Sequence, residues 1–367
     1  MKKCSANNHS LLTLPSPYNH GGVSSFYNAV LPYLPETITP MVVGGAKGIE
    51  MFFRPLMDQL HYHQAVKTNR PILIHLNPSL GLKCFLRDGL FALQAKQQNI
   101  PLLIFWHGWD KSFEGLLEKR LLWFFRHTFG QADGFIVLAS EFKQKLKDWG
   151  VEVPIYLGTT AVEEQLLQHF DLEKKLTRLR KIKTVKILFL ARLERAKGVF
   201  ETVQAIKLLV DKKLPVCLTI AGDGEIRQEL EEYTRTLNLT PQQVNFTGDI
   251  RGKDKISAFA EHHIYCFPTF YGEGLPTSVL EAMAFGMPVV TRPVGGLADI
   301  FEDGKMGALV QGKSPEEIAD CLEKIISDRN QMAEIGRYNA GYAKEHFMAS
   351  VVAKRLLGIY EDLGVCK

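Results

Sequence analysis

The stretch FPTFYGEGLPTSVLEAMAFGMPVVTRPVGGLADIFEDGKMGALV, Phe267–Val310, decides the fold of the second half of the chain. It predicts a short helix with Pro276 at the first helical position, where the missing N–H of proline costs nothing. Gly286 is expected to end this helix, and Pro288 follows it. Four apolar residues recur at helical spacing and are expected to face a core. They are Leu275, Val279, Ala282 and Met283.

Two acidic residues flank the expected start of this helix. Glu273 and Gly274 come just before the N-terminus, where free N–H groups and the helix dipole favour an anion. Glu281 falls off the apolar stripe, on the side of Thr277 and Ser278. The stretch thus combines an anion-binding helix N-terminus, a glycine that lets the backbone approach a ligand, and carboxylates that accept hydrogen bonds from hydroxyl groups. This combination suits a nucleotide sugar.

The size and charge of the chain indicate an ordinary two-domain globular protein. It has 367 residues, of which 46% are hydrophobic and 23% charged. Residues 1–183 contain 22 basic and 15 acidic residues, which gives a net charge of +7. Residues 184–367 contain 22 basic and 25 acidic residues, which gives a net charge of −3. A basic first half indicates either an anionic surface or acceptor, or simply uneven surface charge.

The six cysteines favour a reducing compartment. They are scattered without a CxxC pair, so neither a disulfide framework nor a zinc site is predicted. Cys217 and Cys266 lie in apolar, strand-like runs and are expected to be buried. The polar N-terminus, MKKCSANNHS, lacks a signal-peptide core, and no apolar run approaches the ~20 residues that span a bilayer. We therefore expect a cytoplasmic location.

Short apolar runs alternate with amphipathic ones along the whole chain, which predicts βαβ units and two mostly parallel sheets. In the first half the expected strands are Leu11–Leu14, Pro40–Val43, Ile72–Leu76, Leu102–Trp106, Gly134–Leu138 and Val153–Leu157. In the second half they are Val185–Ala191, Val216–Ala221, Val244–Thr247, Ile264–Pro268, Pro288–Thr291 and Ala308–Val310. The charged run Phe170–Thr184 connects the halves, and a final helix, Asn330–Leu363, is expected to break at His346–Phe347. The fold class is α/β, with two Rossmann-like domains facing a cleft.

Three further motifs follow strands. Asn19–Ser24 contains Gly21-Gly22, a pair that lets backbone N–H groups approach phosphate but that also fits a structural turn. His107 ends a strand and is expected either to face the cleft or to be satisfied by backbone hydrogen bonds. In Ala191–Gly198, Arg192 and Lys197 can neutralise a diphosphate, although the loop also fits a solvated basic turn.

The segment Lys119–Phe129, KRLLWFFRHTF, mixes basic and aromatic residues. It can lie on an anionic membrane with Trp123, Phe124 and Phe125 at the headgroup boundary, or pack on its own sheet. The first alternative gives a peripheral location at the inner face of the cell membrane. No metal pair is expected from His61 and His63, because residues two apart on a helix face different sides.

Taken together, these motifs resemble the retaining, two-domain glycosyltransferases of the GT-B fold, group-4 type (glycosyl transferases group 1). ARLERAKG is similar to the family's GRLxxxKG motif, and GEGLPTSVLEAMAFGMPVV to its Ex7E motif. The first half resembles the family more loosely, through Gly21-Gly22, His107 and Ser140. The sequence departs from the family at Leu157–Val162, where an Asn-Gly-Val-Asp-like turn is usual, and at Asp299 after the Gly-Gly pair.

The resemblance assigns roles to individual residues, in a catalytic group and a donor-binding group. It implies that Arg192 and Lys197 hold the donor diphosphate, that Glu281 accepts hydrogen bonds from the ribose, and that Glu273 contacts the transferred sugar. The backbone at Gly274 and Leu275 is implied to line the pocket, Gly22 to let a loop close on the phosphate, and His107 to contact the sugar. It further implies an acceptor-side domain, 1–165, joined by a C-terminal helix at about 346–367, and a donor domain, 166–345.

The implied activity is sugar transfer, with retention of configuration, from a UDP- or GDP-sugar to a glycan or lipid-linked acceptor in cell-surface polysaccharide biosynthesis. No metal cofactor is expected, because Arg192 and Lys197 can carry the charge of the leaving diphosphate, and no nucleic-acid partner is expected. Three alternatives stay open: a nucleotide-sugar isomerase or epimerase, a non-catalytic nucleotide-sugar-binding relative, and a nicotinamide-dependent enzyme. The last is disfavoured because no GxGxxG fingerprint is present.

Overall fold

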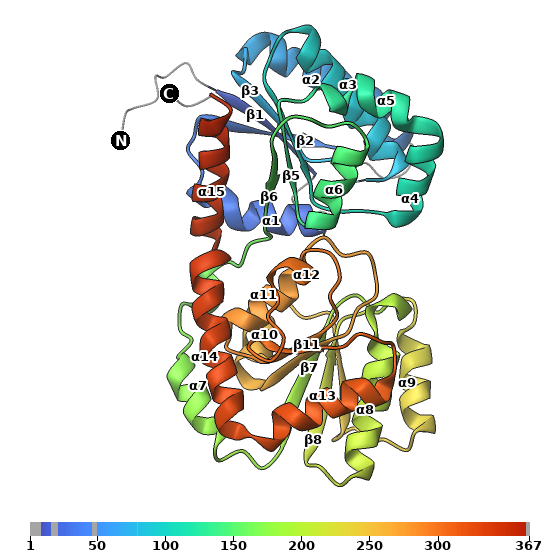
Figure 1. Cartoon of the computed structure of the whole chain (residues 1–367), viewed down its shortest axis with the longest axis vertical. Coiled ribbons are helices and arrows are strands. Elements are labelled where there is room, and N and C mark those ends of the chain that lie inside the picture. Colours follow the sequence, from blue (N-terminus) through green and yellow to red (C-terminus); the bar gives the residue numbers. More distant parts are fainter. Residues whose placement is uncertain (1–8, 16–20, 46–49, 79, 365–367) are drawn as a thin grey trace. The chain divides into compact units, whose positions relative to one another are not determined.

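The computed structural model describes residues 9–15, 21–45, 50–78 and 80–364, in two compact units (Figure 1). Unit 1 contains the described residues up to Ala161, the short segment Gly272–Leu275 and the chain from Ala349 onward. Unit 2 contains Val162–Tyr271 and Pro276–Met348. The first part of the Gly-Gly motif, Asn19 and His20, lies outside the described residues.

Unit 1 is built on a six-stranded parallel sheet, as predicted from the strand–helix alternation. The strand order is β2-β1-β3-β4-β5-β6. The strands are β1 (Ser10–Pro15), β2 (Ile38–Val43), β3 (Leu73–Leu76), β4 (Leu102–Trp106), β5 (Gly134–Val137) and β6 (Ile155–Leu157). The helices are α1 (Gly22–Val30), η1 (Leu31–Tyr33), α2 (Glu50–Asn69), α3 (Leu82–Gln97), α4 (Lys111–Leu116), η2 (Leu117–Leu121), α5 (Leu122–His127), η3 (Phe129–Gln131), α6 (Ser140–Asp148) and α15 (Ala349–Asp362).

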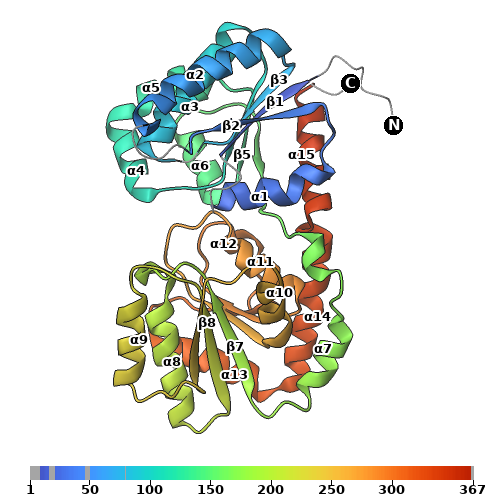
Figure 2. The ribbon, with the colours of Figure 1, turned by 180° about the vertical axis from the view of Figure 1, so that it is seen from behind.

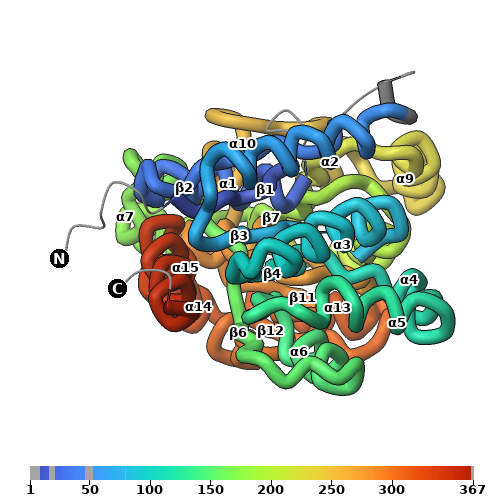
Figure 3. The backbone as a smooth tube through the Cα atoms, turned by 90° about the horizontal axis from the view of Figure 1, so that it is seen from above, coloured from blue at the N-terminus to red at the C-terminus, as the bar shows by residue number. Residues whose placement is uncertain are grey.

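Helices cover the sheet of unit 1 in two groups. The helices α2, α3 and α5 lie side by side (Figure 3), and their inner faces share one apolar core with the strands. Tyr62 of α2 stacks on Phe91 of α3, with ring centroids 4.3 Å apart. The last helix, α15, packs with α1 and η1. Both groups are needed because a parallel sheet exposes an apolar face on each side.

Unit 2 repeats the plan with the strand order β12-β11-β10-β7-β8-β9, all pairs parallel. Its strands are β7 (Val185–Leu190), β8 (Val216–Ala221), β9 (Val244–Gly248), β10 (Ile264–Phe267), β11 (Val289–Thr291) and β12 (Gly307–Leu309). Its helices are η4 (Glu164–Leu167), α7 (Leu172–Leu179), η5 (Arg195–Lys197), α8 (Val199–Asp211), α9 (Arg227–Thr236), α10 (Gly252–Glu261), α11 (Thr277–Ala284), α12 (Leu297–Ile300), α13 (Pro315–Ser327) and α14 (Arg329–His346). Figure 2 shows α8 and α9 beside each other, close to β7 and β8.

The helix predicted from Pro276 begins one residue later, at Thr277. Pro276 has a ψ of 112°, so it is the N-cap in an extended conformation and not the first helical residue. The C-terminal prediction is confirmed, since Gly286 has a φ of +66°. Its N–H donates to Met283 O at 2.9 Å, and Met287 N–H donates to Ala282 O at 3.0 Å. This is a Schellman motif, which only a left-handed residue such as glycine closes without strain.

Two other predictions are settled by burial and by helix bounds. Cys266 is buried as expected, but Cys217 is only half-buried, because it lies on a strand position that alternates with the core. The final helix is interrupted as predicted, at Phe347 and Met348, which separate α14 from α15.

Candidate functional site

The carboxyl ends of β7 and β10 meet at the centre of the unit 2 sheet. The chain runs from β7 to β8 and β9 on one side, and β10 then pairs with the other side of β7. Such a reversal of strand order leaves room for a ligand beyond the strand ends. The β7 end carries the Ala191–Gly198 loop, and the β10 end carries the Phe267–Pro276 stretch.

These two loops are fastened to each other by backbone contacts. The Phe270 N–H donates to Ala196 O at 2.9 Å, and the Thr269 hydroxyl donates to the same oxygen at 3.3 Å. Gly198 has a φ of +79°, and a Cβ there would lie only 2.3 Å from the carbonyl oxygen of Pro268. Glycine is therefore required at position 198 for two reasons: the backbone is left-handed there, and the neighbouring loop leaves no room for a Cβ.

The basic side chains of the first loop differ in their surroundings. Arg192 is 71% exposed and pairs with Glu194 at 3.0 Å. An exposed pair of this kind contributes little stability, so Arg192 can exchange Glu194 for a stronger anion. The ammonium of Lys197 lies 4.0 Å from the ring centroid of Tyr271. Lys197 is thus held against the second loop, and the two predicted diphosphate ligands sit on one turn.

Glu281 of α11 is buried, although it falls off the apolar stripe of that helix. Its Oε1 lies 2.7 Å from Nζ of Lys255, on α10. Burial raises the pKa of Glu281, while the positive charge of Lys255 acts in the opposite direction. The start of α11 is also tied to β7, because the Tyr265 hydroxyl contacts both Leu190 O, at 2.9 Å, and Ser278 Oγ, at 2.7 Å.

In unit 1, His107 follows β4 and is buried. Its Nε2 lies 2.9 Å from Oδ1 of Asn77, which also accepts a hydrogen bond from the Tyr27 hydroxyl at 2.7 Å. Because Oδ1 only accepts, Nε2 carries the proton, and Nδ1 is a buried atom without a hydrogen-bond partner. Burial, and then the nearby His75, lower the pKa of His107 well below its ordinary value. His107 is therefore a neutral imidazole, held by a side chain and not by backbone.

The remaining predicted residues also belong to unit 1. Gly22 is the exposed first residue of α1, and a Cβ there would meet open space. Glu273 is half-buried, whereas Gly274 and Leu275 are buried. A Cβ on Gly274 would lie 2.6 Å from the carbonyl oxygen of His107, so glycine is needed at 274. Unit 1 thus brings Gly274 to His107, and unit 2 brings Lys197 to the loop after β10.

The segment Lys119–Phe129 packs largely on its own unit, which is the second of the two predicted alternatives. Phe125 is completely buried, so the expectation that it lies at a headgroup boundary is wrong. Phe124 packs against Phe85, with ring centroids 5.5 Å apart, while Trp123 is 64% exposed. Consecutive helical residues point 100° apart, so only one of three neighbouring aromatics faces outward.

Two kinds of feature are absent from the residues that the structure describes. These residues contain no group of three or more His, Cys, Asp or Glu side chains placed to hold a metal ion. Within the same residues, no helix combines the length and apolar character needed to cross a membrane.

Sequence reasoning missed the residues that hold the predicted ones in place. Lys255 lies on a different helix from Glu281, and Asn77 is 30 residues from His107. A lysine in the first turns of an amphipathic helix carries no local signal. Asn77 does follow a predicted strand, so its place at the carboxyl end of β3 could have been noticed.

Comparison with known proteins identifies the class of this fold. HepE of Anabaena, solved in complex with UDP-glucose, superposes with a TM-score of 0.73 over 96% of this chain and 99% of that chain, at 17% identity. Both six-stranded parallel units therefore follow the GT-B glycosyltransferase fold.

Sequence similarity to known proteins is concentrated in unit 2. Residues 173–341, which make up most of unit 2, match the model of the family glycosyl transferases group 1. An uncharacterized glycosyltransferase of Methanocaldococcus jannaschii is 27% identical over 68% of this chain and 65% of its own length. The capsular polysaccharide biosynthesis glycosyltransferase CapM of Staphylococcus aureus is 29% identical over 47% of this chain and 44% of its own length. The chain thus spans about half to two thirds of these relatives.

Proposed function

We propose that this protein transfers a sugar from a nucleoside diphosphate sugar, UDP- or GDP-linked, to a glycan or lipid-linked acceptor. The observation that carries the proposal is the fastening of the β7 and β10 loops, which gathers Arg192 and Lys197 at the centre of the unit 2 sheet. Two similar proteins support it, since HepE was solved in complex with UDP-glucose and CapM is a glycosyltransferase of capsular polysaccharide biosynthesis.

The reaction breaks the bond between the anomeric carbon and the diphosphate oxygen, and the bonding pair leaves with the diphosphate. Negative charge therefore grows on the leaving group while positive charge grows on the sugar ring. Arg192 offers a forked pair of donors and Lys197 a compact charge, and both stabilise the leaving diphosphate. Because these cations supply the charge, the reaction is proposed to need no metal ion.

The carboxylates take separate roles in this proposal. Glu281, fixed by Lys255, accepts hydrogen bonds from the ribose hydroxyls. Burial raises the pKa of Glu281 and the positive charge of Lys255 opposes that rise, which favours the ionised carboxylate, the form that offers all its lone pairs to hydroxyl groups. Glu273 contacts the transferred sugar, and Gly274 and Leu275 present backbone groups to it.

The state of His107 restricts its own role. A neutral imidazole with Nε2–H committed to Asn77 cannot act as a general acid through that nitrogen. His107 is instead proposed to contact the transferred sugar as a neutral group. Gly22 is proposed to bring backbone N–H groups of the α1 start to the donor phosphate. Retention of configuration and a role in cell-surface polysaccharide biosynthesis are proposed from the family resemblance.

A nucleotide-sugar isomerase is the alternative that the same site allows, because it would use the same diphosphate and ribose contacts without an acceptor. A donor panel distinguishes the two. The full chain is incubated with UDP-, GDP- and ADP-sugars, with and without a membrane extract as acceptor, and the products are measured by mass spectrometry. Release of nucleoside diphosphate that depends on the extract supports transfer. An altered sugar nucleotide formed without extract supports isomerisation, and no change with any donor refutes both.

A further inference from the structure

Arg292 directly follows β11 and is buried, with only 4% of its surface exposed. Its Nε, Nη1 and Nη2 atoms all lack a hydrogen-bond partner among the described residues. A guanidinium has five N–H donors and stays protonated in proteins. Burying this charge without hydrogen bonds is costly, so another feature of unit 2 must stabilise it.

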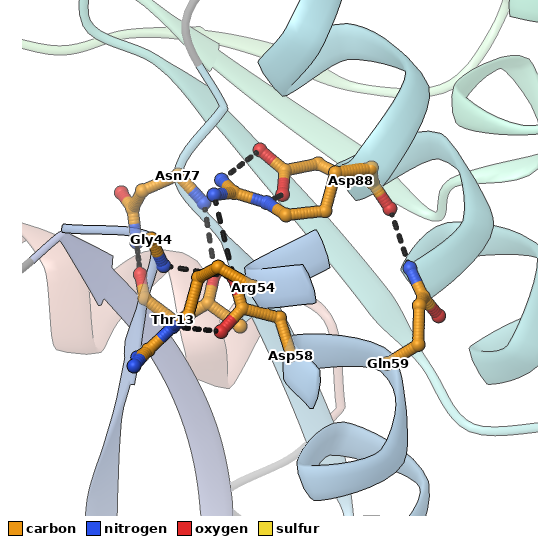
Figure 4. A network of polar contacts seen from close by, with 8 residues as sticks. Thr13, Gly44, Arg54, Asp58, Gln59, Asn77 and Asp88 are labelled. Atoms are coloured by element: carbon orange, nitrogen blue, oxygen red, sulfur yellow. Dashed lines mark hydrogen bonds and ion pairs between the residues drawn. The ribbon is translucent and has the colours of Figure 1, made fainter. Parts of the chain in front are cut away.

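Arg87, on α3 of unit 1, shows the ordinary arrangement of a largely buried arginine. Its Nε donates to Asp88 at 2.6 Å, and its Nη2 donates to the same carboxylate at 3.0 Å (Figure 4). Arg292 has no such forked pair among the described residues. Burial lowers the pKa of Arg292, and the negative charges of Glu201 and Glu317 oppose that fall from a distance. These two acids lie in the first turns of α8 and α13.

An aromatic ring in the loop after β10 takes the place of the missing carboxylate. The guanidinium carbon of Arg292 lies 5.4 Å from the ring centroid of Phe270. The ammonium of Lys313, which precedes α13, lies 3.8 Å from the same centroid. Both distances are within the ~6 Å at which the face of a ring attracts a cation, and the attraction is stronger where water is excluded. Phe270 thus joins two cations that follow β11 and β12.

Hydrogen bonds between strand ends fix the position of Arg292. The Thr291 hydroxyl donates to Phe267 O at 2.9 Å, which ties the end of β11 to the end of β10. The Val310 N–H donates to Thr291 O at 2.8 Å, which ties the end of β12 to the same residue. Arg292 therefore extends from a fixed point of the sheet, and its side chain can hold the loop that carries Phe270.

Phe270 also connects these cations to the loop of the predicted diphosphate ligands. Its N–H donates to Ala196 O at 2.9 Å, and the next ring, that of Tyr271, lies 4.0 Å from Nζ of Lys197. The strand β10 lies between β11 and β7 in the sheet. The loop after β10 is thus held by Lys197 and Ala196 after β7, and by Arg292 after β11.

We propose that Arg292 and Lys313 are positioning residues for the diphosphate site, and that they act through the ring of Phe270. By holding the β10 loop on Ala196, they keep Lys197 at the place where it binds the donor. Arg292 itself is not assigned a contact with the donor, because its side chain is buried. The inference rests on the proposed function, since it concerns Lys197 as a ligand of the diphosphate.

A double-mutant cycle separates positioning from general stabilisation. The affinities of UDP and GDP for the full chain are measured by titration calorimetry. Arg292→Met is expected to weaken binding about five- to tenfold, and Arg292→Lys, which keeps a cation near the ring, to stay within about twofold of wild type. In the Lys197→Ala background, Arg292→Met is expected to change the affinity less than about twofold, because the group that Arg292 positions is gone. A purely structural Arg292 would instead give additive losses.

Hydrogen exchange at the Phe270 amide tests the contact without any donor. This amide is bonded to Ala196 O, so its exchange rate reports how often the two loops separate. Arg292→Met and Phe270→Leu are expected to accelerate the exchange at least about tenfold, and Lys313→Met about threefold. Because Lys313 is exposed, its substitution leaves the core of unit 2 unchanged.

Lys305→Met is the matched control for Lys313→Met. Lys305 is also an exposed lysine of unit 2 over an aromatic ring, since its Nζ lies 5.5 Å from the ring centroid of Tyr338. It is expected to leave both the exchange of the Phe270 amide and the nucleotide affinity at their wild-type values. Circular dichroism checks that each variant is folded, and Lys313→Met and Phe270→Leu decide the question if Arg292→Met is not.

Either of two results overturns the inference. One is wild-type exchange at the Phe270 amide in Lys313→Met and in every folded variant at 270 and 292. The other is additive loss of affinity when Arg292→Met is combined with Lys197→Ala. If the wild-type chain binds neither UDP nor GDP, the proposed function is refuted together with the role of Arg292 toward the diphosphate. The exchange measurement then still decides whether Arg292 and Lys313 hold the β10 loop.

Discussion

Replacement of Gly198 by alanine tests whether the β7 and β10 loops form one unit. The Cβ of the new residue would lie 2.3 Å from the carbonyl oxygen of Pro268 and 2.9 Å from its carbonyl carbon. Both are backbone atoms, so no side chain can rotate away. The loops must separate by about 1 Å to restore an ordinary contact.

The expected magnitude has two parts. Alanine at a φ of +79° is strained by roughly 1–2 kcal/mol, and the steric overlap adds about 1–3 kcal/mol. For a unit of this size, 1 kcal/mol lowers the melting temperature by about 2–4 °C. We therefore expect a fall of about 6–12 °C for a total near 3 kcal/mol. Because Lys197 precedes Gly198, we also expect affinity for a nucleoside diphosphate to fall at least about tenfold.

Gly304→Ala is the matched control for this substitution. Gly304 has a φ of +80°, and a Cβ there would meet nothing within 4 Å. It therefore shares the backbone strain of Gly198→Ala without the overlap. Melting is followed by calorimetry, and binding of UDP and GDP by titration calorimetry. If both variants lose the same stability and both keep wild-type affinity, the loops are not coupled and the reasoning is refuted.

Three further outcomes are expected. Lys255→Met removes the positive charge beside Glu281, so the pKa of Glu281 rises further. When donor affinity is measured as the pH is lowered, the variant is expected to lose affinity at a higher pH than the wild type. Identical pH profiles would contradict the role of Lys255. Activity is expected to survive EDTA, and inhibition that a divalent ion reverses would contradict the proposed metal independence. Burial lowers the pKa of Lys175 to about 7, whereas the side chain in the unfolded chain titrates near 10.5. Between these two pH values Lys175 is protonated in the unfolded chain but not in the folded one. The free energy of unfolding therefore rises with pH in that window. Denaturant titrations from pH 7 to 10 should show this rise in the wild type and a smaller one in Lys175→Met, and parallel curves would refute it.

The architecture was predictable because its signals are local. Strand bounds at Leu102–Trp106 and Val216–Ala221 match the predicted runs residue for residue, since apolar runs with flanking turns define buried parallel strands. The end of α11 was equally predictable, because the backbone at position 286, with a φ of +66°, favours glycine. The start was misplaced by one residue, because proline fits both the N-cap and the first helical turn.

The features that sequence reasoning missed depend on contacts between distant residues. The burial of Glu281 follows from Lys255 of α10, and no spacing rule connects the two. The burial of Phe125 beside the exposed Trp123 depends on the rotation of α5, which its packing on α3 fixes.

The measurement closest to the central claim is the affinity of UDP and GDP for Lys197→Ala beside Arg195→Ala. The two basic residues belong to the same short turn, but Arg195 pairs with Glu229 and lies over the ring of Phe200, 4.6 Å from its centroid. If the turn holds the diphosphate as proposed, Lys197→Ala weakens nucleotide binding about ten- to a hundredfold, because one charged contact is lost. The affinity of Arg195→Ala stays within about twofold of the wild-type affinity. Equal affinity in both variants and the wild type would contradict the assignment of the donor site to these loops.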